Sequence, residues 1–172
     1  MLTNKDLVEW LFPRVGREKD IGEKKESIEE YEKRKLEEYK KLARRYGLAS
    51  IEEYLALEKL AQYIGKSVES MFIEGYFEVR NGHVTYLKLR ELALQSLPEE
   101  IGKFKYLKLL DVYGNYLEEL PKSIGNLENL EILVLTSNRL KELPYEIGEL
   151  KKLRKLYLEG NKIRELPKSI GD

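Results

Sequence analysis

The chain has 172 residues, of which 42% are hydrophobic, and this is enough to bury the core of one or two compact units. Its 31 basic and 31 acidic side chains cancel to a formal net charge of zero, which argues against a protein that binds nucleic acid or another polyanion. The absence of cysteine excludes disulfide bonds, thiolate nucleophiles and cysteine-based zinc sites.

The start of the chain does not resemble a signal peptide, because Lys5, Asp6 and Glu9 interrupt any apolar stretch. No run approaches the roughly 20 apolar residues of a membrane span, so we expect no membrane association. These features, and the lack of cysteine, predict a cytoplasmic protein. A charged fraction of 36% favours a thermophilic source, since ion-pair networks gain value as temperature rises.

The first two predicted helices differ in length. One runs from Asn4 to Phe12, with Thr3 as its cap and Pro13 as its stop. The second runs from about Glu23 to Tyr46, where apolar and tyrosine side chains recur at helical spacing and a glycine supplies the end. Its basic residues follow acidic ones four positions earlier, which predicts a solvated helix and not an anion-binding patch.

The third predicted helix begins with a capping box, Ser50-x-x-Glu53, and ends at Gly65. The helices either dock on the following repeats or move on a flexible joint near Gly65 to Gly75. Residues 1–75 are therefore predicted to form a helical domain or cap, and residues 76–172 a second domain. The helices either cover the open end of the following repeats or form an independent recognition module.

A β-hairpin is predicted where Phe77–Arg80 and His83–Tyr86 flank Asn81-Gly82, since both turn residues tolerate a positive φ. We expect this hairpin to seal the first repeat. His83 is interpreted as a solvated strand residue, with a role as a functional acid or base as the alternative.

A unit of 23 residues repeats through the second half, with Leu-Pro recurring at 97, 120, 143 and 166 and Ile-Gly following each Pro. Such a period predicts a solenoid in which each copy contributes a short strand and a return segment. Asn115, Asn138 and Asn161 end the three complete strands and are expected to bond buried backbone groups of their own and neighbouring coils. The leading copy has Leu92 at this position, as is common in a terminal repeat.

These motifs resemble the leucine-rich repeat family, specifically the 23-residue type found in plant intracellular Ras-group and microbial members. The resemblance covers residues 84–172. It implies an α/β solenoid of about four coils with a parallel, concave sheet, and it implies protein recognition without catalysis. It says nothing about residues 1–75.

In that family the outward strand positions form the binding face, which here gives three columns. An apolar and aromatic centre, anchored by Tyr113, Ile132, Val134 and Tyr157, then lies inside a charged rim, as at many interfaces. The predicted protein-binding columns are Tyr86, Leu109, Ile132 and Lys155; Lys88, Asp111, Val134 and Tyr157; and Arg90, Tyr113, Thr136 and Glu159.

Two other interpretations stay open. Strand propensity alone would also place Val, Ile and Tyr at these positions. The face measures on the order of 300 Å², against about 800 Å² per partner in a standard interface. The last coil, moreover, ends in its convex segment with no polar cap, which indicates either a longer array or self-association, most simply as a homodimer.

No enzyme is predicted. The paired glutamates have no histidine or cysteine at ligand spacing, and nucleotide-binding and hydrolase motifs are missing from the sequence. We expect no catalytic residue, metal site or cofactor. The leading hypothesis is a protein-binding scaffold with an unidentified protein partner, and the alternative is a self-assembling structural module.

Overall fold

The computed structural model describes residues 28–171. The expected helix Asn4–Phe12 and the expected start of the second helix at Glu23 lie outside the described residues.

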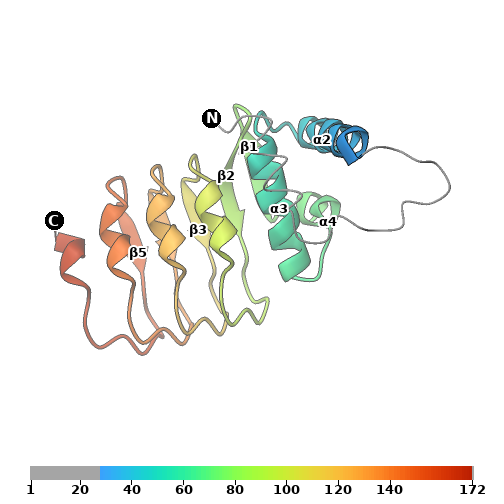
Figure 1. The fold of residues 1–172 in the computed structure, drawn as a ribbon. Coiled ribbons are helices and arrows are strands. Elements are labelled where there is room, and N and C mark those ends of the chain that lie inside the picture. Colours follow the sequence, from blue (N-terminus) through green and yellow to red (C-terminus); the bar gives the residue numbers. More distant parts are fainter. Residues whose placement is uncertain (1–27, 172) are drawn as a thin grey trace.

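Within residues 28–171, three helices precede a series of stacked coils (Figure 1). Each coil places a strand on one side and a 3-10 helix on the other, and the strands form one sheet in the order β1-β2-β3-β4-β5. β1 pairs antiparallel with β2, whereas the pairs β2–β3, β3–β4 and β4–β5 are parallel. The helices are α2 (Ile28–Arg45), α3 (Ile51–Tyr63) and α4 (Val68–Ile73); the strands are β1 (Phe77–Arg80), β2 (His83–Lys88), β3 (Leu109–Asp111), β4 (Ile132–Val134) and β5 (Lys155–Tyr157); the 3-10 helices are η1 (Glu99–Lys103), η2 (Lys122–Asn126), η3 (Tyr145–Glu149) and η4 (Lys168–Gly171).

The β1–β2 hairpin turns through Asn81 and Gly82, whose φ angles of 53° and 83° are both positive. Arg80 pairs with His83 directly across this two-residue turn. The Asn-Gly pair therefore forms the turn that the sequence predicts.

The segment from Gly65 to Gly75, where a flexible joint was one of two alternatives, contains the short helix α4. Ser67 caps this helix, its side chain accepting a hydrogen bond from the Ser70 amide at 3.1 Å. Val68 and Met71 of this helix are buried. A helix of six residues has too few turns for a clear apolar period, which explains why the sequence pattern did not reveal it.

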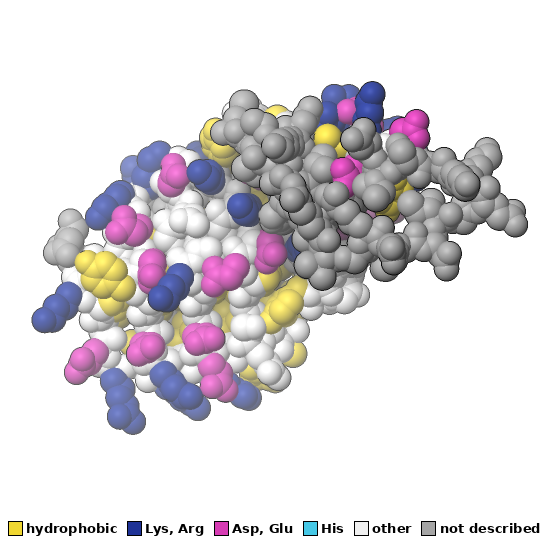
Figure 2. Space-filling view, viewed as in Figure 1, with side chains coloured by type: hydrophobic (Ala, Val, Ile, Leu, Met, Phe, Trp, Pro, Cys, Tyr) yellow, Lys and Arg dark blue, Asp and Glu magenta, His cyan; other side chains and the backbone are white. Residues whose placement is uncertain are grey.

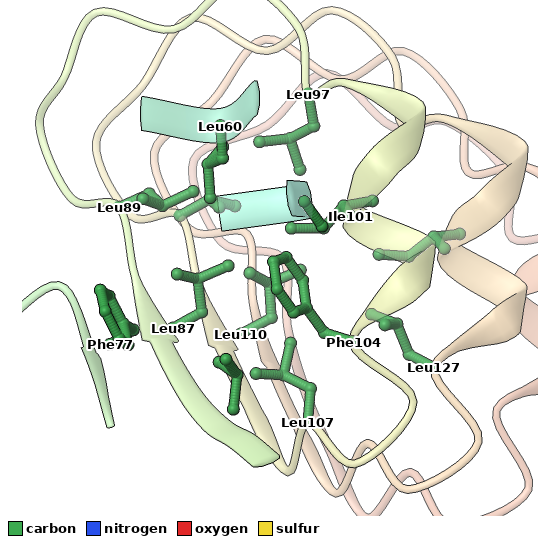
Figure 3. Packing of buried hydrophobic residues seen from close by; sticks show 14 of the residues in the cluster. Leu60, Phe77, Leu87, Leu89, Leu97, Ile101, Phe104, Leu107, Leu110 and Leu127 are labelled. Carbon is green, nitrogen blue, oxygen red and sulfur yellow. The ribbon is translucent and has the colours of Figure 1, made fainter. Parts of the chain in front are cut away.

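One cluster of buried hydrophobic side chains runs from α2 through α3, α4 and the hairpin to the third 3-10 helix. Leu60 of α3 points into the same interior as Leu87 and Leu110 of the strands and Phe104 (Figure 3). α3 also packs against η1. The helices and the first coil thus share a core, while the domain division at residue 75 remains a prediction.

The 3-10 helices lie unusually close to one another, and the repeated Gly of the Ile-Gly pair permits it. A Cβ added at Gly125 would lie 2.8 Å from the Glu146 carbonyl oxygen, and one at Gly102 would lie 2.6 Å from that of Ser123. Real Cβ atoms do not approach backbone so closely, and forcing such a contact overpacks the interior. Glycine at this position is therefore a packing requirement of the repeat.

Asparagines at the strand ends tie neighbouring coils together. The Asn138 Nδ2 donates to the carbonyls of Val112, one coil back, and of Leu135, in its own coil, at 3.0 and 2.9 Å. Its Oδ1 accepts from the Leu117 amide at 3.0 Å. Asn161 makes the same kinds of bond one coil later, to Leu135, Leu158 and Leu140. The Val112 carbonyl is consequently shared by Asn115 and Asn138, and the Leu135 carbonyl by Asn138 and Asn161.

Candidate functional site

The sheet register aligns the outward side chains of four strands into columns. Tyr86, Leu109, Ile132 and Lys155 are directly paired neighbours, as are Lys88, Asp111, Val134 and Tyr157. Backbone bonds from Glu91 to Tyr113, from Gly114 to Thr136 and from Ser137 to Glu159 continue this alignment into the third column. We refer to these three columns as the strand face, and they contain the twelve residues predicted from the sequence.

The centre of the strand face is apolar and partly open to solvent. Leu109, Ile132 and Val134 are half-buried and stand outside the hydrophobic core, whose members lie on the other side of the sheet. Tyr113 and Tyr157 are 38% and 39% exposed. The face therefore offers apolar surface that the fold itself does not use.

Asp111 differs from its expected place on an exposed rim, because it is only 1% exposed. Its carboxylate pairs with the Arg90 guanidinium, whose Nε donates to Oδ2 at 2.7 Å, and its Oδ1 accepts from the Tyr113 amide at 3.1 Å. The hydrogen bond and charge of Asp111 raise the pKa of Arg90. A buried carboxylate needs such partners, so Asp111 is a structural residue that orients Arg90 and the start of the third column.

The remaining charges lie at the two ends of the strand face. Lys88 of β2 is exposed and stands 3.7 Å from the Glu78 carboxylate. Lys155 of β5 is exposed at the opposite end. Glu159 is exposed as well and accepts a hydrogen bond from Thr136 at 3.0 Å.

A second polar cluster, which the sequence did not reveal, joins α3 to the hairpin. Glu53 is 3% exposed, and its Oε2 accepts from the Val84 amide at 2.7 Å. The His83 Nδ1 lies 2.8 Å from Glu53 Oε1, and its ring stacks on Tyr106 at a centroid distance of 3.7 Å. His83 is therefore held by packing and hydrogen bonding, and the expectation of a solvated residue is wrong.

Only one of the two hydrogen bonds of the capping box is present at the start of α3. Ser50 Oγ accepts from the Glu53 amide at 3.3 Å, as the motif predicts. The Glu53 side chain instead reaches the hairpin. Burial raises the pKa of the Glu53 carboxyl, while the bonds from Val84 and His83 oppose that effect. The cluster links α3 to the β1–β2 hairpin.

Within residues 28–171, no group of three or more His, Asp or Glu side chains is arranged to hold a metal ion. No helix in this part of the chain combines the length and apolar character that crossing a membrane requires.

Family comparison agrees with the geometry of the array. Residues 77–140 match the description "Leucine-rich repeat region", and residues 128–169 match "Leucine Rich repeats (2 copies)". Residues 77–169 belong to the leucine-rich repeat family. No curated protein matches this leucine-rich repeat chain.

Solved structures include several similar leucine-rich repeat proteins. The ectodomain of the receptor kinase SOBIR1 from Arabidopsis thaliana is 27% identical, with 69% of this chain and 70% of that chain covered and a TM-score of 0.56. The PEPR1–AtPEP1 structure is 26% identical over 65% of this chain and 17% of that chain, with a TM-score of 0.52. A leucine-rich repeat protein of Leptospira interrogans is 45% identical over 45% of this chain, with a TM-score of 0.45; the chain spans only 20% of that protein. The first two support a leucine-rich repeat solenoid.

The rest of the leucine-rich repeat surface offers a contrast to the strand face. In the view of Figure 2, acidic and basic side chains intermingle over the coils, and no large area carries a single sign of charge. Tyr145 on η3 is 65% exposed but stands on a 3-10 helix, away from the strands.

Proposed function

We propose that the leucine-rich repeat region binds a protein partner through the strand face. The observation that carries this proposal is the aligned patch of Leu109, Ile132 and Val134, which is partly exposed and makes no contribution to the core. Apolar surface inside a polar rim is typical of an interface. The similar receptor ectodomain and the PEPR1–AtPEP1 pair support a binding role for this fold.

The size of the face favours a short segment of the partner. An area on the order of 300 Å² is well below the about 800 Å² that a globular partner normally covers. A linear peptide lies flat across four strands and needs no larger surface. The proposed ligand is therefore an extended segment of another protein.

Selection of random linear peptides on phage tests this function. Peptides that bind the wild-type chain should lose at least about tenfold in affinity when Ile132→Asp and Val134→Asp are combined, because two carboxylates replace the apolar centre. Neither residue belongs to the core, so circular dichroism should show an unchanged fold.

The matched control is Tyr145→Asp, which adds a charge at an exposed aromatic residue outside the strand face. Affinity should stay unchanged in this variant. Equal binding by the wild type and the Ile132/Val134 double variant, measured by calorimetry, would contradict the proposal.

A second candidate function is self-association through the face of the last coil. Leu153, Leu156 and Leu158 are partly exposed there, whereas their counterparts one coil earlier are fully buried, and Leu166 is 53% exposed. Light scattering over a wide concentration range should then show a homodimer that Leu166→Lys converts to a monomer. A wild-type monomer at every concentration would exclude this function.

A further inference from the structure

We infer that the ligand of the strand face is an extended peptide whose apolar centre is flanked by two acidic residues four positions apart, on the same side of the peptide. This inference rests on the proposed function and specifies the chemistry of its partner. It follows from the distribution of charge around the apolar patch.

Two lysines at opposite ends of the face have charge available for a ligand. Lys155 forms no ion pair with any of the residues 28–171, and it stands in the same column as Ile132 and Leu109. Lys88 has its one described carboxylate neighbour, Glu78, at 3.7 Å, with both side chains exposed to solvent, and such a pair is weak. An approaching carboxylate therefore meets a cation at each end.

The other charges on the face do not cancel this pattern. Arg90 is already neutralised by the buried Asp111. Glu159 lies four residues from Lys155 along the chain, which is about 13 Å in an extended strand and too far for direct pairing. Because Glu159 repels an acidic ligand, it restricts such a ligand to the first two columns.

The separation of the lysines sets the spacing of the acids. Lys88 and Lys155 are three strands apart, about 14 Å, and two positions apart along the strand direction, which together give about 16 Å. An extended peptide rises about 3.3 Å per residue, and its side chains share a face only at even separations. Acids four positions apart, about 13 Å, therefore fit best, and the flexible lysine side chains bridge the remaining distance. The side chain midway between the two acids also faces the sheet and then lies over Leu109, Ile132 and Val134, which are apolar. The ligand's backbone gains few hydrogen bonds, because the backbone groups of the strands already bond to one another within the sheet. The side chains of the ligand must therefore supply recognition.

Fluorescence anisotropy with two synthetic peptides tests the inference. One contains Asp-Leu-Tyr-Val-Asp between Gly-Ser flanks, and the other has Lys in place of both Asp residues. The wild-type chain should bind the acidic peptide about tenfold more tightly, and high salt should reduce this difference because the contacts are exposed.

Charge reversal provides the decisive variant. Lys88→Glu combined with Lys155→Glu should invert the preference, so that the basic peptide binds more tightly. Both lysines are exposed, and folding should be unaffected. As a control, Lys103→Glu combined with Lys122→Glu makes the same charge change on η1 and η2 and should preserve the preference for the acidic peptide.

The outcomes separate this inference from the proposed function. Both peptides could bind the wild type equally and both lose affinity in the Ile132→Asp, Val134→Asp variant. This result would overturn the inferred preference for an acidic ligand, while the proposed binding at the strand face would stand. If neither peptide binds and phage selection also yields no ligand dependent on Ile132 and Val134, the proposed function and this inference fall together.

Discussion

Asn115→Ala is expected to lower the free energy of unfolding by about 4 kcal/mol, roughly twice the loss from Asn138→Ala, because it leaves more buried backbone groups without a partner. Asn115 Oδ1 accepts from the amides of Leu92 and Leu94, both at 3.0 Å. Its Nδ2 donates to the Leu89 carbonyl at 2.7 Å. Since the first coil has Leu92 where the others have asparagine, no second side chain serves these groups.

The smaller loss at Asn138 follows from the sharing of carbonyls between coils. Without Asn138, the Val112 carbonyl keeps its bond from Asn115, and the Leu135 carbonyl keeps its bond from Asn161. Only the Leu117 amide loses its partner. Urea unfolding of both variants measures the difference, with the exposed Asn126→Ala as a control near zero. Equal losses at Asn115 and Asn138 would contradict the sharing argument.

Glu53→Ala is expected to lower the free energy of unfolding by about 3 kcal/mol, because it leaves the Val84 amide buried without an acceptor. Glu53→Gln should cost less than half as much, since its carbonyl oxygen still accepts from Val84 and its amide can donate to His83. Thermal and urea unfolding measure both variants. Similar losses for Ala and Gln would show that the carboxylate charge, and not the hydrogen bond, stabilises the junction between α3 and the hairpin.

The raised pKa of Glu53 adds a pH dependence to this comparison. A carboxyl whose pKa is raised on folding binds a proton more tightly in the folded state, so its stabilising effect is complete below the unfolded value and is lost as the pH rises through the folded value. The wild type should therefore gain stability relative to Glu53→Gln as the pH falls from neutrality toward 4.5, the ordinary value. Repeating the measurement with His83→Gln separates the titration of the neighbouring histidine.

The sequence predicted the array well because a fixed spacing determines the register. Residues 23 positions apart, such as Leu109 and Ile132, became strand neighbours, and the alternation within each strand assigned them to the outward face. The strand face could therefore be mapped before its structure was known. Whether this face binds a protein remains a prediction.

The sequence could not identify side chains whose partners lie in distant elements. Glu53 matched a local capping motif, but its carboxylate reaches residues 30 and 31 positions away in the hairpin. Asp111 occupied an outward position, yet Arg90 of the preceding coil covers and neutralises it. In both cases tertiary contacts override a local pattern, and neither the apolar period nor a motif carries information about them.

The close approach of the 3-10 helices also determines how strongly the array bends. An α-helix with its side chains is about 10 Å wide, whereas adjacent strands are about 4.8 Å apart, so a solenoid with α-helices on its outer side must curve sharply. Here Gly102 and Gly125 let narrow 3-10 helices lie almost in contact, which shortens the outer circumference. We therefore expect a shallow inner surface, on which a bound chain would remain open to solvent along one side and able to dissociate quickly.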